Sequence, residues 1–508
     1  MSDGTSDRGK PMIDRGLQRV GESMAAAPHG VFEAVLIFLA AVALVYLFIA
    51  KSPYYAIGAV VVLFAVLFLL RKPIMLSYTL LLLLPIYWLN LLGRSLRVIT
   101  MLTLIAVVYH AVKILLAREP LRFNRVYLAF GLYLVSCALS LINSSDLELS
   151  YLGTKYFLLA IAMGWVLIVS VRTKEQLRVL LLILIGWGVA QSVLGMLQTF
   201  VSIKFFPAYH FQTFGLPIVD AYSVGGVRRA SGTFQIGPRY AMFLMLPLAI
   251  VVTGFLSRTI FHRRTWLLLL TPFVFGIFVS LTRIAIALSL VYVIFYNFFT
   301  RRRQALLASI AGLLVLTMLV GVVALLIPAD VKYALGQRFG DEDDEVYRDR
   351  LYFLWNALGA FTENPFLGIG VGTYENRSWE FMQKYPVPWR QVRWDVAAQR
   401  NMPEAVPVHN EYGRMLAEQG MFSIPIFLFL LLTAFRNLNY AYQHSQDEFI
   451  RTMSVGVSIF LLAMSGYWYF HEYFMEEPYI SILPFAFSVI IYNLVHDEQE
   501  APPDNAQA

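Results

Sequence analysis

Apolar runs long enough to cross a membrane recur along this chain of 508 residues. A helix needs about 20 mainly apolar residues to cross a hydrocarbon layer about 30 Å thick, because each residue advances about 1.5 Å. Hydrophobic residues make up 58% of the chain and charged residues only 14%, far from the composition of a soluble domain. The sequence therefore predicts an all-α integral membrane protein with about 14 transmembrane helices, in a range of about 12 to 14.

The positions of the apolar runs give the individual spans. Residues 265–281 and 284–299 are separated only by Thr282 and Arg283, and we interpret them as a tight helical hairpin because one helix could not hold them both. The predicted spans are 31–50, 53–70, 74–92, 98–116, 126–142, 153–171, 177–200, 236–256, 265–281, 284–299, 305–327, 419–435, 450–470 and 478–495.

One polytopic membrane domain, residues 31–495, accounts for most of the chain. It is preceded by a polar tail, residues 1–30, and followed by a tail, residues 496–508, whose composition predicts disorder. Two long loops interrupt it, at 201–235 and 328–418. Within the larger loop, apolar residues spaced three to four apart predict an amphipathic helix over 345–361, and the glycines of "GIGVG" (368–372) predict a tight turn.

Lys and Arg residues gather on alternate connections between the spans. Because cytoplasmic loops collect these residues, the pattern places both termini in the cytoplasm and both long loops outside. The connections 143–150 and 471–477 contain no Lys or Arg and fit the external side. Cytoplasmic flanks also account for the net charge of +7, so no nucleic-acid partner is implied.

Several external polar residues could carry chemistry. Guanidinium groups match phosphate oxygens, so Arg228, Arg229, Arg239 and Arg283 are candidates to bind an anionic lipid headgroup, although arginines beside membrane spans also reach ordinary lipid phosphates. A neutral imidazole can accept a proton from a hydroxyl, which makes His409 a candidate general base; a hydrogen-bonded interfacial histidine is the alternative.

Two weaker features complete the search for a site. His471 and Glu472 form a second external constellation. The acidic run "GDEDDE" (340–345) lacks an ordered spacing of metal ligands and is interpreted as a solvated loop, so no metal and no other cofactor is expected.

Four segments, in order along the chain, resemble the O-antigen ligase and O-antigen polymerase superfamily. They are "RRASGTFQIGPRYAMFLMLPLAI" (228–250), "SLTRIAIALSL" (280–290), "RLYFLWNALGAFTENPFLGIGVGTYENR" (350–377) and "VHNEYGRMLAEQGMFSIPIFLFL" (408–430). The resemblance implies an enzyme at the outer face of the bacterial inner membrane. Such an enzyme transfers a glycan from undecaprenyl diphosphate to an acceptor hydroxyl, without a nucleotide sugar or a metal.

The resemblance also implies roles for individual residues. Arg229 and Arg283 match arginines that engage the diphosphate, and His409 matches the histidine of the large periplasmic loop. A substrate-binding role is further expected for Arg228, Arg239, Asn410, Glu411 and Tyr374. Thr282 stands where the superfamily more often has Ser.

Within the superfamily, about 14 spans favour a polysaccharide polymerase, for an exopolysaccharide or capsule, over a ligase that acts on lipopolysaccharide or protein. The expected partners are the carrier-linked glycan, a glycan acceptor, membrane lipids, and polysaccharide assembly or export proteins. A transporter or flippase is the alternative from another class, but transporters place ionisable residues near the bilayer midplane, whereas most charges here lie at span ends. A scaffold in an export complex is a third alternative.

Overall fold

A computed structural model describes ten segments of the chain. They are residues 72–86, 98–117, 123–202, 223–224, 227–234, 236–257, 259, 261–311, 342–385 and 408–500. The predicted tail 1–30 and the predicted spans 31–50 and 53–70 lie outside them. The chain divides into two compact units, residues 1–80 with 90–123, and residues 81–89 with 124–508.

The first unit contributes the start of α3 (Pro73–Leu83) and the whole of α4 (Val98–Ala117). Helix α3 is followed by a 3-10 turn, η1 (Leu84–Ile86), beyond which the predicted span 74–92 leaves the described residues. Helix α4 coincides with the predicted span 98–116 and is long and apolar enough to cross a membrane.

In the described residues of the second unit, all regular secondary structure is helical apart from one short antiparallel hairpin, β1 (Ser223–Val224) with β2 (Val227–Arg228). This confirms the predicted all-α class. Its helices are α5 (Arg125–Ser140, extended by η2, Leu141–Asn143), α6 (Leu147–Ser170), α7 (Lys174–Phe200), α10 (Gly237–Ser257), α11 (Arg263–Val279), α12 (Arg283–Leu290), α13 (Tyr292–Phe299), α16 (Glu342–Glu363), α17 (Tyr374–Lys384), α19 (Glu411–Gln419), α20 (Ser423–His444), α21 (Glu448–Phe470), α22 (Tyr473–Glu476) and α23 (Pro478–Glu500).

Eight helices among the described residues are long and apolar enough to cross a membrane, so the predicted total of about 14 spans is not confirmed. The predicted span 284–299 is two helices, α12 and α13, that break at Val291. The predicted span 419–435 begins later, at Ser423, because Gly420, with a φ of 78°, separates α19 from α20.

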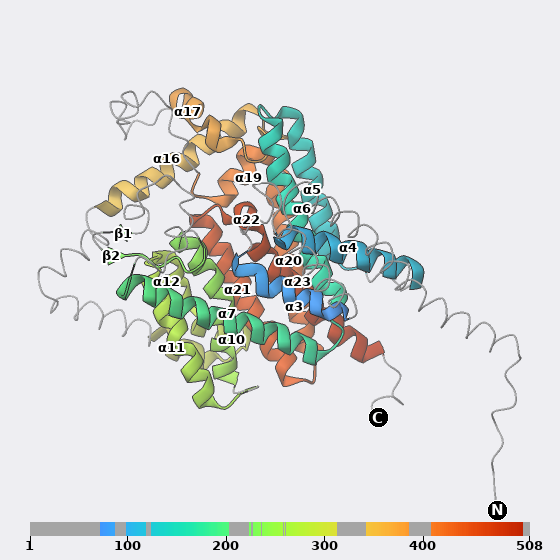
Figure 1. Ribbon diagram of the computed structural model, residues 1–508. Helices are drawn as coiled ribbons and strands as arrows, with labels where there is room; N and C mark the ends of the chain where they lie inside the picture. Colours follow the sequence, from blue (N-terminus) through green and yellow to red (C-terminus); the bar gives the residue numbers. More distant parts are fainter. Residues whose placement is uncertain are drawn as a thin grey trace, which may run out of the picture. The chain divides into compact units, whose positions relative to one another are not determined.

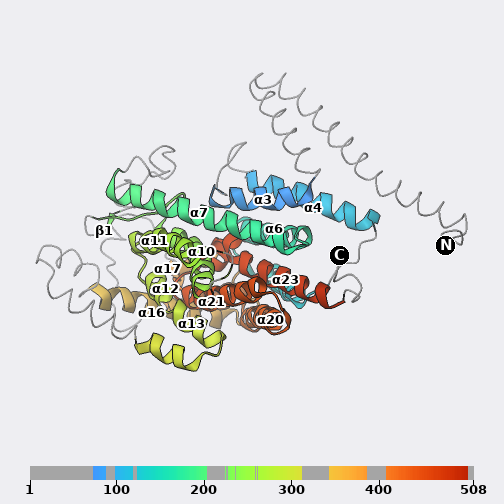
Figure 2. The same ribbon diagram turned by 90° about the horizontal axis from the view of Figure 1, so that it is seen from below.

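Helices α10, α21 and α23 form the centre of the second unit. Their apolar windows are 83%, 78% and 89% buried inside the protein, whereas those of α5, α6, α7 and α20 are only 39% to 44% buried. Figure 2 shows α6 and α7 on one side of this centre and α20 on the other. The peripheral helices must therefore cover their remaining apolar surface with something other than this chain.

The outward face of α5 is an exposed apolar stripe of the kind that lipid chains cover in a membrane. Leu128, Leu132, Val135 and Leu139 recur at helical spacing and are each at least 40% exposed. In water such a stripe would be unfavourable, but lipid chains are as apolar as leucine. This face, like the exposed apolar residues of α11, indicates a multi-pass membrane protein.

One end of the bundle is closed by a charged contact among three helices. The ammonium group of Lys174 lies 2.8 Å from Asp447 and 2.6 Å from Glu498. These contacts hold the last turns of α23, which runs to Glu500, so residues 496–500 of the tail expected to be disordered are helical. The hydroxyl of Tyr440 donates to Gln499 at 2.6 Å and adds to this order.

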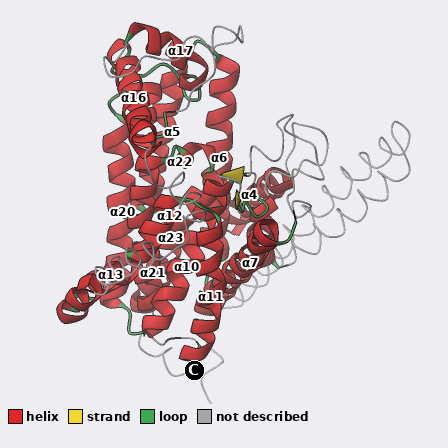
Figure 3. Cartoon of the chain, turned by 90° about the vertical axis from the view of Figure 1, so that its left-hand side faces the viewer, coloured by secondary structure: helices red, strands yellow, loops and turns green. Residues whose placement is uncertain are grey.

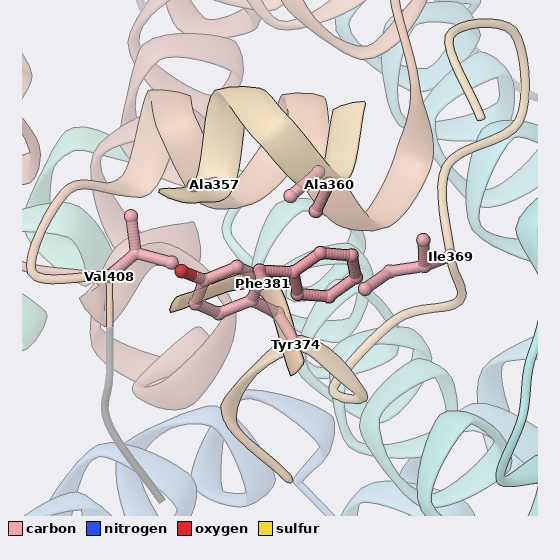
Figure 4. Close-up of a cluster of buried hydrophobic side chains, with 7 residues drawn as sticks. Ala357, Ala360, Ile369, Tyr374, Phe381 and Val408 are labelled. Atoms are coloured by element: carbon pink, nitrogen blue, oxygen red, sulfur yellow. The ribbon is translucent and has the colours of Figure 1, made fainter. Parts of the chain in front are cut away.

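Helices α16 and α17 lie at the opposite end, away from the C-terminal end of α23 (Figures 1 and 3). The amphipathic helix predicted over 345–361 is present as α16. A small apolar core joins α16, α17, the last turn of α19 and the segment before α19, and Figure 4 shows most of its members: Ala357, Ala360, Ile369, Tyr374, Phe381, Val408 and Ala417.

The predicted glycine turn docks this loop region onto α19. Gly368, Gly370 and Gly372 all have positive φ values, and a Cβ on Gly368 would lie 2.2 Å from the backbone carbon of Glu418. The amide of Ile369 donates to the carbonyl of Ala417 at 2.9 Å, and that of Gly370 to the carbonyl of Glu418 at 3.1 Å. These amides are thus used to hold α19 in place.

Candidate functional site

The loop before α10 is fixed to α7 by two glutamine side chains. Gln198 accepts hydrogen bonds from the amides of Ser231 and Gly232 and donates to the carbonyl of Gly232 at 2.7 Å. Gln191 exchanges hydrogen bonds with Thr233 in the same way. Buried backbone groups require such partners, so these two polar residues inside a membrane-grade helix shape the loop that carries Arg229.

Arg229 reaches from this loop to the turn between α11 and α12. Its Nε donates to the carbonyl of Ser280 at 2.7 Å, and its Nη2 donates to the hydroxyl of Thr282 at 2.9 Å. Gly237 leaves room for the guanidinium, because a Cβ there would lie 2.3 Å from Nε. Within the turn, Leu281 has a φ of 51°, a strained conformation for a leucine. Arg229 therefore holds the turn from which α12 starts.

Arg283, the first residue of α12, follows that turn directly and is half-buried. Arg350 approaches it from α16. The guanidinium of Arg350 lies 5.7 Å from the ring centre of Phe470, at the end of α21. Burial and the positive charge of Arg283 lower the pKa of Arg350, which places both guanidinium groups in one electrostatic neighbourhood.

His409 lies between the large loop and the start of α19. Its φ of 53° is the left-handed conformation, which is uncommon outside glycine and is often found at functional sites. Its ring lies 5.9 Å from that of Phe353, one helical turn after Arg350. Burial, together with the charge of Arg350, lowers the pKa of His409 to about 4, so its imidazole is neutral at pH 7.

A second histidine stands beside this group. His471 is stacked on Tyr473, with ring centres 5.1 Å apart, and also contacts Tyr467 at 4.7 Å. Burial holds the pKa of His471 well below its usual value, with Arg350, His409 and Arg229 adding in that order. Five basic side chains from separate segments therefore share one region, which we call the basic cluster: Arg229, Arg283, Arg350, His409 and His471.

A different arrangement surrounds Arg239 and Arg414. Arg239 lies 2.7 Å from Glu477 and 3.3 Å from Glu476, and Arg414 lies 3.2 Å from Glu418 and 3.2 Å from Glu476. We call this group the glutamate cluster. It ties α10, α19 and the segment around α22 together. The charge of Arg239, predicted to bind substrate, is thus already matched by two carboxylates.

The other predicted substrate-binding residues have structural contacts. Asn410 caps α19 by accepting from the amide of Gly413, and it donates to the carbonyl of Tyr469 at 2.8 Å. Tyr374 stacks on Phe381 in the loop core. Arg228 is half-buried on β2.

Glu411 is buried between α19 and α22. One oxygen of its carboxyl group, Oε2, accepts from the amide of Phe474 at 3.0 Å, and Oε1 has no hydrogen-bond partner. Burial raises the pKa of Glu411 to about 8. A protonated carboxyl group fits this environment, because an unpaired charge would be costly there.

Sequence reasoning did not select Arg350 or Arg414. Arg350 could have been found, because it lies four residues from both Val346 and Leu354, on the apolar stripe of the predicted amphipathic helix. A single arginine on such a stripe is unfavourable unless its charge interacts with another group of the protein or with a ligand. For Arg414 the available signal was its four-residue spacing from Glu418.

The fold and the basic cluster define the class: a multi-pass membrane protein with a concentration of cationic and imidazole groups at one end of its helix bundle. Over the described part of the chain, no group of three or more His, Cys, Asp or Glu side chains could hold a metal ion. The guanidinium and imidazole groups of the basic cluster suit an anionic ligand rather than a cation.

Residues 265–428 match the family model described as O-antigen ligase, which confirms the resemblance to the O-antigen ligase and polymerase superfamily. The matched region runs from α11 into α20 and contains Arg283, Arg350 and His409, whereas Arg229 precedes it. No curated protein matches the chain significantly.

Proposed function

We propose that the protein transfers a glycan from a lipid diphosphate carrier, undecaprenyl diphosphate, to an acceptor sugar hydroxyl at the external face of the bacterial inner membrane. The observation that carries this proposal is the convergence of the Arg229–Arg283 turn and His409 in the basic cluster. A cluster of this kind can bind a diphosphate and, at the same place, accept a proton.

In this mechanism the oxygen of the acceptor forms a bond to the anomeric carbon while the bond from that carbon to the carrier phosphate breaks. The electron pair of the broken bond leaves with the diphosphate, whose growing charge Arg283 stabilises. Arg229 orients the turn that carries Arg283. The hydroxyl proton moves to His409.

The charge surroundings of His409 suit this role. With a pKa of about 4, its imidazole is neutral at pH 7 and able to accept a proton, but it is a weak base. An anionic diphosphate among the arginines would favour the protonated imidazole and raise the pKa of His409. The base would therefore become stronger when the donor is bound.

The acceptor in this proposal is another carrier-linked repeat, which makes the protein a polysaccharide polymerase. A ligase, which hands the finished glycan to a different acceptor, is the second candidate, because the matching family model is described as O-antigen ligase. The two reactions share the donor and the site and differ in their product.

Reconstitution tests the proposal directly. The full-length protein in lipid vesicles is supplied with carrier-linked repeats from its host, and the products are separated by length. We expect a ladder of lipid-linked polymer from the wild type, none from His409→Ala, and a normal ladder from His444→Ala, which alters a histidine on α20 hydrogen-bonded to the carbonyl of Tyr440.

The other outcomes are equally informative. Transfer of single glycans to an added acceptor, with no ladder, would support the ligase. A folded His409→Ala variant with full activity would refute the assignment of the base. Appearance of the substrate across the vesicle membrane without any transfer would refute the enzyme and support a transporter.

A further inference from the structure

His409 is held on both sides by the C-terminal end of α21 and the residues after it. The amide of Val408, directly before it, donates to Oε2 of Glu472 at 3.0 Å. The side chain of Asn410, directly after it, donates to the carbonyl of Tyr469 at 2.8 Å. The partners in these bonds are 64 and 59 residues apart along the chain. Two distant segments therefore meet at a single residue, the candidate base.

These two bonds matter because of the backbone conformation of His409. Its φ of 53° is left-handed, and a residue other than glycine keeps such a conformation only where its surroundings fix it. The hydrogen bonds made by the residues on either side supply that restraint. Loss of either bond would release the backbone of His409 and allow its imidazole to move.

The bond to Glu472 differs from the bond to Tyr469 in having no role in a helix. Asn410 also caps α19 through the amide of Gly413, so its side chain is needed for the helix itself. Glu472 stands at the N-cap of α22, yet its side chain makes no capping bond and instead accepts from the amide before His409. The carboxyl group is thus directed away from its own helix and toward the base.

The surroundings of this carboxyl group are unfavourable for a glutamate. Burial raises the pKa of Glu472 well above its usual range, and the carboxyl group of Glu476 raises it further, while Arg414 opposes them. The amide of Val408 is buried and requires an acceptor. A glutamate that reaches it from another segment satisfies this amide and also fixes the distance between the two segments.

We propose that Glu472 is a positioning residue for His409: the hydrogen bond that its carboxyl group accepts from the amide of Val408 keeps the imidazole in its place beside Phe353. Glu472 acts through His409 and does not itself touch the substrate. This inference rests on the proposed function, in which His409 accepts the proton of the acceptor hydroxyl. A base works only within hydrogen-bond reach of that proton, and a displacement of about 1 Å can cost about 10²-fold in rate.

Two substitutions of Glu472 separate its geometry from its charge. Glu472→Gln keeps the length of the side chain and an acceptor oxygen but loses the charge, whereas Glu472→Asp keeps the charge and is shorter by one methylene group. We expect Glu472→Gln to keep kcat within a few-fold of the wild type. Glu472→Asp should lower kcat by about 10-fold to 100-fold and leave KM nearly unchanged, because the base is displaced without loss of a substrate contact.

The matched control is Asp447→Glu at the other end of α21. Asp447 accepts from the amide of Phe449 at 2.8 Å, so the substitution alters the length of a carboxylate in the same kind of bond, far from His409 along the helix. Its rate per folded molecule should equal that of the wild type. A loss in Glu472→Gln as large as that in Glu472→Asp, no loss in Glu472→Asp, or an equal loss in the control would overturn the inference.

The imidazole of His409 is also followed directly by NMR, with the full-length protein in nanodiscs labelled at its 8 histidines. The signal of His409 is identified by its absence from His409→Ala. Because burial and the charge of Arg350 lower the pKa of His409 to about 4, a displaced imidazole should titrate nearer to the ordinary value of about 6.5. We expect this change in Glu472→Asp and not in Glu472→Gln or Asp447→Glu. A titration of His409 in Glu472→Asp like that of the wild type would contradict the inference.

The two measurements distinguish this inference from the proposed function. If the wild type transfers no glycan but Glu472→Asp moves the titration of His409, the proposed function fails and the positioning of His409 by Glu472 stands. If the wild type transfers glycan and Glu472→Asp matches it in both rate and titration, the positioning fails and the proposed function stands.

Discussion

Two groups of arginines lie at the same end of this protein and differ in the groups that contact their guanidinium groups. In the glutamate cluster, Arg239 and Arg414 are each paired with two carboxylates within 3.3 Å. In the basic cluster, Arg229 is bonded to neutral oxygen atoms, and Arg350 lies near the positive charge of Arg283 and the neutral imidazoles of His409 and His471.

The difference teaches how to tell a structural arginine from a binding one. A buried charge is tolerated when it is paired, so the glutamate cluster is complete without any ligand. In the basic cluster, Arg229 is held instead by a carbonyl and a hydroxyl oxygen, and guanidinium and imidazole groups from separate segments lie together, which is an arrangement suited to binding an anion. Substitutions in the basic cluster should therefore lower turnover, whereas substitutions in the glutamate cluster should lower stability.

The largest effect on turnover is expected from Arg283→Ala. Losing one donor that stabilises the charge of the leaving group typically costs about 10² to 10³ in rate. The measurement is the rate of glycan transfer per molecule of folded protein, with Arg377→Ala as the matched control. An Arg283→Ala protein that inserts normally and keeps its full rate would remove Arg283 from the site.

The pH dependence of kcat/KM reports the protonation state of His409 in the basic cluster. Because the pKa of His409 in the free enzyme is lowered to about 4, the neutral base persists as the pH falls from 7 to 5.5. An ordinary histidine would lose about 10-fold over that range. We expect little loss of kcat/KM in the wild type over this range. In Arg350→Gln the acid limb should move to higher pH, since the charge of Arg350 helps to lower the pKa of His409. A wild-type limb near 6.5 would contradict this.

Arg239→Ala should act on stability rather than on turnover. The substitution leaves Glu477, which is almost fully buried, without its cation and leaves Glu476 paired with Arg414 alone, and an uncompensated buried charge is strongly destabilising. We expect the thermal unfolding temperature to fall by several degrees, while the folded fraction keeps its transfer rate within a few-fold. The control is Arg263→Ala, an exposed arginine over the ring of Phe255. A stable but inactive Arg239→Ala protein would show that Arg239 takes part in binding or turnover, as proposed for the basic cluster.

The smallest effect is expected from Glu411→Gln. Because the folded-state pKa of Glu411 is raised to about 8, the folded protein holds a proton that the unfolded chain releases above about pH 4.3. Stability from this group is therefore present at low pH and is lost as the pH rises through 8. Glutamine mimics the protonated form, so the unfolding temperature of the variant should match that of the wild type at pH 4 and should fall less than that of the wild type as the pH rises to 9. A lower unfolding temperature at both pH values would show that the carboxylate form is needed.

Two residues of the candidate site could be selected from the sequence because they stand in recognisable local contexts. Arg283 interrupts two apolar runs, and His409 precedes a membrane-length run, so both were selected from the sequence. Glu476 and Glu477 were not selected, because nothing local distinguishes a solvated acidic pair from one that neutralises an arginine more than 230 residues away. For the same reason Arg239 looked equivalent to Arg229.

The sequence by itself determined the class of this protein. Apolar runs of membrane length specify helices, since a helix alone satisfies its own backbone hydrogen bonds in lipid, and the motifs of residues 228–430 indicated the superfamily. Only the tertiary structure decided which arginines are neutralised. That distinction depends on which carboxylates lie within a few ångströms, and Coulomb interactions follow distance in space rather than separation along the chain.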